Sequence, residues 1–308
     1  MSKKKVIIDC DPGHDDAAAI VLAARSPELE LLGITCVAGN VEVEKTSANA
    51  VRLCGFAGIR TVPVLKGMAQ PLVGEMITAT HIHGESGLGG VNLPETDLKL
   101  HSGHAVDFLI ETIMASDGNI TLIPTGPLTN IAMAILREPR IALNISGIVL
   151  MGGAMGMGNV TPSAEFNIFA DPEAAKIVFQ SGAPLVMVGL DVTHKAVLTR
   201  EHLANIRQNG TLVADCLASM LLWHLDAITK LGRPKWTALH DACAVASVCD
   251  PTLLTTEPMW VDIETRGEFT RGRTVCDPGL SAGAAPNVRV GVDFDSKRFY
   301  DMLISRLL

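Results

Sequence analysis

Residues 5–25 of the chain read Lys-Val-Ile-Ile-Asp-Cys-Asp-Pro-Gly-His-Asp-Asp-Ala-Ala-Ala-Ile-Val-Leu-Ala-Ala-Arg. The short apolar run from Val6 to Ile8 predicts a buried strand, and Pro12 with Gly13 predicts a turn. The alanine-rich segment that begins at Asp15 predicts a helix. Four carboxylates are therefore expected together, where the strand ends and the helix begins. They belong to Asp9, Asp11, Asp15 and Asp16.

These four carboxylates favour a site for a cation. Asp9 and Asp11 stand two apart, so they project to the same side if the strand continues that far, while Asp15 and Asp16 favour the positive end of the helix dipole. Two like charges ~4 Å apart repel by roughly 4 kcal/mol at an effective dielectric of ~20, and a helix terminus offsets only about 1 kcal/mol. Oxygen ligands of this kind indicate Ca²⁺ or Mg²⁺ rather than zinc. An alternative interpretation is that one or two of these aspartates cap the helix and the others lie in solvent. This alternative does not explain why Asp9 and Asp11 directly follow a strand that is predicted to be buried.

Length and charge restrict the class of protein. With 308 residues, 48% of them hydrophobic, the chain can bury a large core, and we expect a single domain over residues 1–308. A net charge of −8, with no basic run longer than the three lysines at 3–5, argues against nucleic acid and anionic membranes as partners. No signal peptide or membrane span is predicted, and seven cysteines without a Cys-x-x-Cys pair fit reduced thiols. We therefore expect a cytoplasmic protein.

Strand-like and helix-like segments alternate through the first part of the chain. Nearly continuous apolar strands separated by helices predict an α/β fold with a Rossmann-like open sheet, mostly parallel and flanked by helices on both faces. Beyond Leu190 the pattern becomes more helical, and residues 260–275 predict a small β-hairpin. In such folds ligands bind beyond the carboxyl ends of the strands. The acidic loop, Asn40, Thr125 and Met151 are therefore expected to converge on one rim.

The opening stretch also carries a resemblance to a known family. Asp-Cys-Asp-Pro-Gly-His-Asp-Asp (9–16) resembles the N-terminal signature of the nucleoside hydrolases, the inosine-uridine-preferring and related ribonucleoside hydrolases. The resemblance implies the nucleoside hydrolase fold and hydrolysis of the N-glycosidic bond of ribonucleosides to ribose and free base, a reaction of nucleoside salvage. Further motifs recur in family order along nearly the whole chain. They are Val-Ala-Gly-Asn (37–40), His-Ile-His-Gly-Glu-Ser-Gly (81–87), Thr-Gly-Pro-Leu-Thr-Asn (125–130), Met-Gly-Gly-Ala (151–154), Ala-Glu-Phe-Asn (164–167) and Leu-His-Asp (239–241).

The resemblance implies a Ca²⁺ site and a ligand set. In the family the ion is held by aspartates that match Asp11, Asp16 and Asp241 and by the backbone carbonyl of the residue that matches Thr125. On the residues alone, Thr125 with the following Gly-Pro is also explained as a strand-to-helix turn, and Asp241 as a helix N-cap.

Ribose-binding groups are likewise implied by the resemblance, although alone each of these polar residues is explained as a solvated loop residue. The 2′- and 3′-hydroxyls are assigned to Asp15 and Asn40, and the 5′-hydroxyl to Asn159, Glu165 and Asn167, with Met151 in the same site.

The reaction itself suggests two further roles. Cleavage of the sugar–base bond builds positive charge on the ribose, needs an activated water, and needs a leaving base that is protonated or held as an anion. We predict Asp11 as general base and, from the family position, His240 as the acid that protonates the base. His83 is placed at the base side by the resemblance. A lone histidine near a helix start is also explained structurally.

Two other classes compete with this interpretation. Asp9-Cys-Asp11 after a hydrophobic strand also fits the nucleophile loop of haloacid-dehalogenase-like phosphatases, which leaves the segments 81–87 and 164–167 unexplained. A catalytically silent nucleoside-binding protein on the same fold is the third possibility, and an intact Asp11 argues against it.

Base preference is the least determined feature. Family members present base-contacting side chains in the region that matches residues 222–239, where pyrimidine-preferring relatives tend to place tyrosine and glutamine. This chain has neither there, and either Trp223 or Trp236 is a candidate for stacking on a base. The general resemblance leans to pyrimidine ribonucleosides, uridine and cytidine, with a purine or broad inosine-uridine preference as the alternative. The family further implies a homo-oligomer, a tetramer or a dimer.

Overall fold

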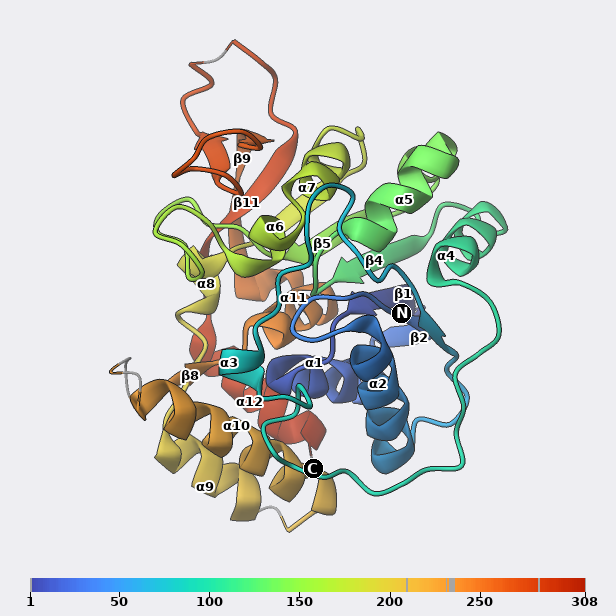
Figure 1. Cartoon of the computed structure of the whole chain (residues 1–308), viewed down its shortest axis with the longest axis vertical. Helices are drawn as coiled ribbons and strands as arrows, with labels where there is room; N and C mark the ends of the chain where they lie inside the picture. The colour runs from blue at the N-terminus through green and yellow to red at the C-terminus, as the bar shows by residue number, and fades with distance from the viewer. Residues whose placement is uncertain (1, 209, 231, 233–235, 282, 308) are drawn as a thin grey trace.

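The predicted N-terminal strand lies inside a nine-stranded sheet, in a computed structural model that describes residues 2–208, 210–230, 232, 236–281 and 283–307. The strand order is β10-β9-β11-β6-β5-β4-β1-β2-β3. Figure 1 labels β9, β11, β5, β4, β1 and β2 of this sheet. Neighbours from β11 to β3 are parallel, whereas β9 is antiparallel to both β10 and β11. The strands of this sheet are β1 (Lys4–Cys10), β2 (Leu29–Cys36), β3 (Val64–Lys66), β4 (Ile120–Pro124), β5 (Gly147–Met151), β6 (Leu185–Val188), β9 (Leu254–Ile263), β10 (Thr274–Asp277) and β11 (Val288–Phe294).

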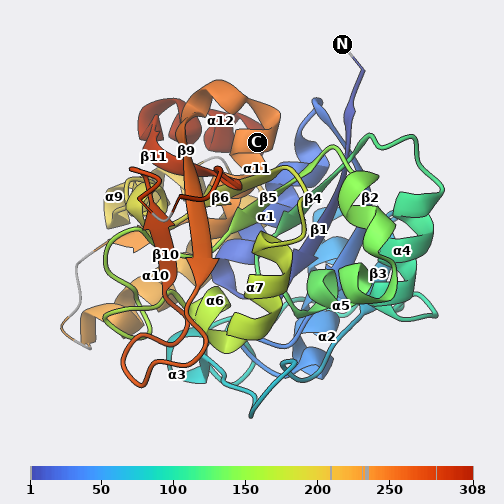
Figure 2. The ribbon, with the colours of Figure 1, turned by 90° about the horizontal axis from the view of Figure 1, so that it is seen from above.

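Helices cover both faces of the sheet because its strands are apolar on both sides. Along β1, Val6 and Ile8 face one hydrophobic core and Ile7 faces the other, as the alternation of side chains requires. The first core includes α1, α2 and α9 to α12, and the second includes α4, α5 and α7 (Figure 2). The helices are α1 (His14–Arg25), α2 (Val43–Ala57), α3 (Thr80–His83), α4 (Ala105–Met114), α5 (Thr129–Arg137), α6 (Phe166–Ala170), α7 (Pro172–Phe179), α8 (Leu190–Thr193), α9 (Arg200–Gln208), α10 (Leu212–Lys230), α11 (His240–Cys249) and α12 (Ser296–Leu307).

The order of the strands determines where a ligand binds. From β1 the chain winds outward through β2 and β3, and then returns to the other side of β1 with β4, β5 and β6. Loops after β1 and β4 therefore leave the sheet in opposite directions and open a crevice between them. Asp11 follows β1 and Thr125 follows β4, so both lie at this switch point.

The predicted fold class is confirmed, and the structure adds details that the sequence left out. The predicted hairpin at 260–275 corresponds to β9 and β10, but β9 also pairs with β11 and so extends the main sheet. A small second sheet joins β7 (Val197–Leu198) to β8 (Thr237–Ala238). Two short 3-10 helices cover Pro139–Leu143 and Pro251–Leu253.

One described helix, α10, is long and apolar enough to cross a membrane by length and composition. A core helix passes the same test, and 44% of the apolar window of α10 is buried inside the fold. Its buried residues, such as Leu217, Leu221 and Leu225, belong to the same core as α1, so the helix packs within the protein.

Candidate active site

A pocket of about 480 Å³ lies at the switch point, within the size range typical of small-molecule sites. It collects predicted site residues from seven separate parts of the chain. Those that line it are Asp15, Asn40, His83, Thr125, Met151, Asn159, Glu165, Asn167, His240 and Asp241. The other two predicted residues, Asp11 and Asp16, are buried at 1% and 0% exposure and do not line the pocket.

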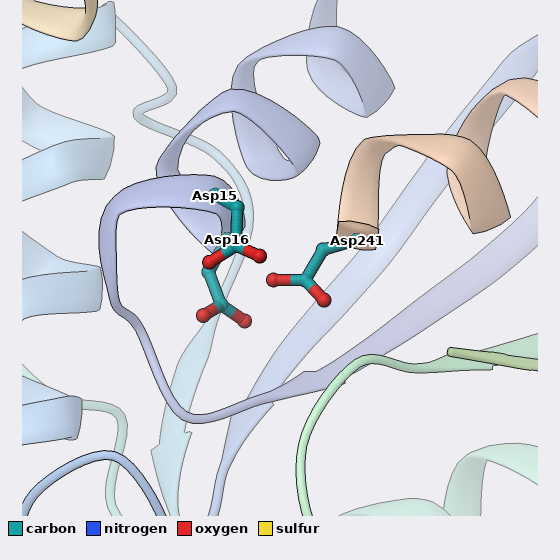
Figure 3. Close-up of side chains that lie close together, drawn as sticks. All are labelled: Asp15, Asp16 and Asp241. Carbon is teal, nitrogen blue, oxygen red and sulfur yellow. The ribbon is translucent and has the colours of Figure 1, made fainter. Parts of the chain in front are cut away.

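Three aspartates at the starts of two helices form an acidic cluster at this pocket. Asp15 and Asp16 stand in the first turn of α1, and Asp241 stands in the first turn of α11 (Figure 3). One carboxylate oxygen from each lies within 4.8 Å of the other two. Asp241 is not the N-cap of its helix, because α11 begins at His240 and is preceded by Leu239 as N-cap. The three carboxylates can therefore bind one ion together.

Asp11 is fixed beside this cluster by the turn after β2. Its Oδ2 accepts a hydrogen bond from the backbone N–H of Asn40 (2.7 Å), and its backbone carbonyl accepts one from the Asn40 side chain (3.0 Å). A Cβ added at Gly39 would lie 2.1 Å from Asp11 Oδ2, so only glycine lets this turn come so close. The Val-Ala-Gly-Asn motif thus holds the Asp11 carboxylate in place.

Asp16 connects the acidic loop to the end of β4. Its Oδ2 accepts a hydrogen bond from the N–H of Gly13 (2.9 Å), and its Oδ1 accepts one from the hydroxyl of Thr125 (2.9 Å). The carbonyl of Thr125 in turn accepts a hydrogen bond from Nδ2 of Asn167 (2.9 Å). The strand-to-helix turn at Thr125 therefore also takes part in the site.

The electrostatics of these carboxylates favour a bound cation. Burial, and then the charge of Asp16, raises the pKa of Asp15 to about 7 and raises the pKa of Asp11 well above its usual range. The pKa of Asp241 is raised well above normal by burial and by the charges of the other three. Among the described residues no lysine or arginine forms an ion pair with any of the four. An oxygen-only, anionic donor set of this kind fits a hard divalent ion, which would compensate the repulsion.

Asp9 lies outside this acidic cluster, contrary to the prediction that all four aspartates meet. Strand β1 ends at Cys10, and the Oδ1 atom of Asp9 accepts hydrogen bonds from Thr35 (2.5 Å) and Asn130 (2.8 Å). These two partners stand on β2 and in the first turn of α5. Asp9 therefore joins the end of β2 to the start of α5 beneath the site, and β1 ends before Asp11.

The opposite wall of the pocket is formed by the start of α6. Glu165 caps this helix, with its carboxylate accepting hydrogen bonds from the backbone N–H groups of Asn167 (3.0 Å) and Gly153 (2.9 Å). Burial raises the pKa of Glu165 to about 7. Asn159 is exposed and caps the N–H of Phe166 (2.9 Å). Met151 is buried at the end of β5. The wall therefore offers polar groups on a rigid element.

Histidines also line the pocket, and we call the part of it that is lined by four of them the histidine end. These four are His83, His194, His224 and His240. The Nδ1 atom of His240 lies 2.7 Å from the hydroxyl of Thr193, and Nδ1 of His224 lies 3.0 Å from the hydroxyl of Thr237. Burial, followed by the neighbouring histidines, lowers the pKa of His83 and of His240 to about 3. These imidazoles are therefore neutral near pH 7, and each can offer one N–H donor and one nitrogen acceptor to a ligand.

Several residues at this end were not singled out by the sequence. His194 and His224 line the pocket together with Ile228. Of the two tryptophans that the sequence offered as candidates for stacking on a base, Trp236 lines the pocket beside His194, whereas Trp223 does not line it. Residues 231 and 233–235 of the predicted base-contacting segment lie outside the described residues. His224 follows an apolar run on α10, and the sequence gave no signal that distinguished it from a structural histidine.

Comparison with known proteins agrees with this geometry over the whole chain. The family model described as inosine-uridine preferring nucleoside hydrolase matches residues 6–301. The pyrimidine-specific ribonucleoside hydrolase RihA of Salmonella agona is 46% identical over 310 residues, covering 98% of this chain and 97% of that protein.

Solved structures give the same result. A plant nucleoside hydrolase, the PpNRh1 enzyme, superposes with a TM-score of 0.95 at 34% identity, covering 99% of both chains. The purine-preferring ribonucleoside hydrolase from Gardnerella vaginalis superposes with a TM-score of 0.93 at 38% identity, covering 99% of this chain and 98% of that one.

The fold and the site therefore define an enzyme that hydrolyses the N-glycosidic bond of ribonucleosides. The chain belongs to the inosine-uridine preferring nucleoside hydrolase family. This membership confirms the resemblance found in the sequence and removes the phosphatase interpretation of Asp9-Cys-Asp11. The family is metal-dependent, and the acidic cluster is the candidate metal site.

Proposed function

We propose that this enzyme is a Ca²⁺-dependent hydrolase of pyrimidine ribonucleosides, which it converts to ribose and free base. One observation carries the proposal: a single pocket is lined both by carboxylates of the acidic cluster and by neutral histidines. A ribonucleoside has both kinds of partner group, a diol that suits a metal site and a base that suits hydrogen-bonding rings. The lining of the pocket therefore offers partners to both halves of the substrate.

The ion would be held by Asp11, Asp16, Asp241 and the carbonyl of Thr125. These are hard oxygen donors, which favour Ca²⁺ over zinc, and a site with several carboxylates suits the high coordination number of calcium. When bound, Ca²⁺ supplies binding of the vicinal diol and a lowered pKa for a coordinated water. Asp11, already fixed by Asn40, accepts the proton of the attacking water.

The ribose would be bound by polar side chains on both walls. Asp15 and Asn40 receive the 2′- and 3′-hydroxyls, while Asn159, Glu165 and Asn167 receive the 5′-hydroxyl beside Met151. The carboxylates along this path also stabilise the positive charge that develops on the sugar in the transition state. Asp15 and Glu165 stand at helix starts rather than on free loops. Their carboxylates are therefore already in place to stabilise that charge.

His240 would act on the departing base. Because Thr193 engages Nδ1, the ring nitrogen left for the base is Nε2. When the Thr193 hydroxyl donates to Nδ1, the neutral ring carries its proton on Nε2, where it donates a hydrogen bond to the base and stabilises the negative charge that develops on the base as the bond breaks. His83 contacts the base from α3.

The preference for uridine and cytidine rests on the relatives. The RihA relative, named pyrimidine-specific, shares 46% of its residues with this chain, against 38% for the purine-preferring enzyme of known structure. The base end has Ile228, Trp236 and histidines, so it supports either stacking or hydrogen bonding of a small ring. A purine or broad inosine-uridine preference is the alternative.

Side-by-side values of kcat/KM for uridine, cytidine, inosine and guanosine test this proposal. We expect ribose release from all active substrates to require Ca²⁺ and to be fastest with the pyrimidines. Higher kcat/KM for inosine and guanosine would contradict the pyrimidine preference while leaving the reaction itself intact. Absence of ribose from all four nucleosides would contradict the proposed activity.

We further propose that the enzyme is a homotetramer in the cytoplasm. Family members are commonly dimers or tetramers, and a hydrophobic fraction of 48% is compatible with buried subunit surfaces. Light scattering at micromolar protein should give four times the mass of the chain. A monomer mass would overturn this assembly.

A further inference from the structure

Four aromatic rings pack together behind the histidine end of the pocket, and we call His14, His83, His224 and Trp223 the ring cluster. The ring centroid of His14 lies 4.8 Å from that of His83, 5.2 Å from that of His224 and 5.5 Å from that of Trp223. The plane of His14 is tilted by only 17° to His83 and 3° to His224. His14 thus stacks on the other three members of the cluster.

His14 is buried in a way that hydrogen bonding does not explain. Its side chain is 1% exposed, and neither ring nitrogen has a hydrogen-bond partner among the described residues. A buried polar group without a partner destabilises the fold, a cost that an apolar side chain of similar size would avoid. His14 does not line the pocket, whereas His83 and His224 do. Its flat ring therefore acts on the pocket only through the rings that it touches.

The cluster also joins two elements that are distant in sequence. His83 ends α3, whereas Trp223 and His224 stand in α10. Gly89, in the segment after α3, has a φ of +59°, and a Cβ there would lie 2.5 Å from His14 and 2.6 Å from Trp223. This glycine lets the segment close over both rings. The position of α3 is consequently tied to that of α10 through the stack.

We propose that His14 is a positioning residue that sets the orientation of His83 and His224 toward the base of the substrate. The inference rests on the proposed function, because it places the base at the histidine end of the pocket. Stacking fixes the planes of both outer rings and itself uses none of their nitrogen atoms. Misplacing such a group by about 1 Å can cost up to ~10²-fold in rate.

Two substitutions at His14 distinguish the effect of its flat ring from the effect of the volume that the side chain fills. His14→Leu keeps an apolar side chain but removes the flat ring, and His14→Phe restores a ring. We expect His14→Leu to lower kcat for uridine by about tenfold or more and His14→Phe to recover most of it. Hydrolysis of p-nitrophenyl riboside should stay nearly unchanged in both variants, because its leaving group is stable as an anion and needs no oriented histidine. Bound Ca²⁺ should also stay the same.

Leu22→Ala is the matched control, since Leu22 is buried on the same helix α1 but lies outside the ring cluster. It should lower thermal stability without changing the ratio of the two substrate rates. Equal losses on uridine and p-nitrophenyl riboside, a loss of metal, or a phenylalanine variant as slow as the leucine variant would each overturn the inference.

Trp223→Leu tests the cluster from α10, away from the acidic loop, and remains informative if His14→Leu does not fold. It should reproduce the selective loss on uridine, and its combination with His14→Phe should be non-additive because the two rings touch. Full activity of Trp223→Leu on both substrates would contradict the role of the cluster. Failure of the wild-type enzyme on every nucleoside would instead contradict the proposed function, so the two failures are distinguishable.

Discussion

The hydroxyl of Thr125 donates a hydrogen bond to Oδ1 of Asp16, across 2.9 Å and 109 positions of sequence. This contact links the start of α1 to the turn after β4, the two elements that flank the switch point. The other oxygen of Asp16 accepts from the N–H of Gly13. Asp16 is therefore oriented by the backbone of its own loop and by the neighbouring strand end before any ion is bound.

The first prediction concerns this residue. Purified enzyme should contain about one Ca²⁺ per chain, and Asp16→Ala should lose the metal and the activity together, because the remaining carboxylates no longer complete the donor set. Metal analysis of both proteins, with activity measured before and after chelation, checks this. Asp97→Ala, at an exposed ion pair with Arg60, is the control and should retain both. Zinc in the protein, or full activity after exhaustive chelation, would contradict the prediction.

The second prediction concerns the contacts beneath the site. Asn130 donates hydrogen bonds to Asp9 (2.8 Å) and to the carbonyl of Cys36 (3.1 Å), and it accepts one from the N–H of Met68 (2.8 Å). Asn130→Ala should lower the free energy of unfolding by roughly 3 kcal/mol, since it leaves several buried polar groups without partners. Urea unfolding measures the loss. Asn144→Ala, at a half-buried asparagine that bonds two carbonyls, should cost clearly less. Similar losses at the two positions would show that burial of the bonds does not determine the cost.

The sequence was sufficient to predict the parallel sheet and the loop that bears the acidic residues. Both depend on local patterns, namely apolar strands, a Pro-Gly turn and acidic residues in a first helical turn. The order of the family motifs then predicted that Asp241 and Asn167 share a site with Asp15, although no local pattern relates them. All three line the same pocket. What each of these residues does in catalysis remains a prediction.

Long-range packing explains what the sequence did not predict. The alternation of side chains placed Asp9 with Asp11 only if β1 continued past Cys10, and the strand ends there instead. Pairing of β9 with β11 joins residues 29 to 40 positions apart, with β10 between the two strands in the sequence, so no single turn connects them. The contact of His240 with Thr193 likewise depends on how α8 packs beside α11. Such contacts follow from tertiary structure, whereas sequence patterns report local structure.

The third prediction is a pH effect on stability that arises from His83. The unfolded chain binds a proton on this residue near the usual histidine pKa of 6.5, whereas burial lowers the pKa of His83 in the fold to about 3. Between these values the unfolded state binds more protons, so stability falls as the pH drops from 6.5 towards 3. His83→Gln removes this contribution, which we put on the order of 1 kcal/mol between pH 7 and pH 5.

Urea midpoints of the wild type and of the variant at the two pH values test this effect. The drop on acidification should be smaller in His83→Gln. His101→Gln, at an exposed histidine, serves as control and should behave as the wild type. An identical drop in the wild type and in His83→Gln would mean that His83 does not resist protonation in the folded protein.

The last prediction isolates His240. If this residue gives a proton to the departing base, its contribution depends on how much the base needs one, because a leaving group that is stable as an anion gains little from an acid. His240→Ala should slow uridine hydrolysis by roughly 10²–10⁴-fold yet leave p-nitrophenyl riboside nearly unaffected. Asp11→Ala should impair both substrates, since water activation is common to them. Equal losses on the two substrates in His240→Ala would mean that the residue positions Asp241, its neighbour in α11, and that the base takes its proton from elsewhere.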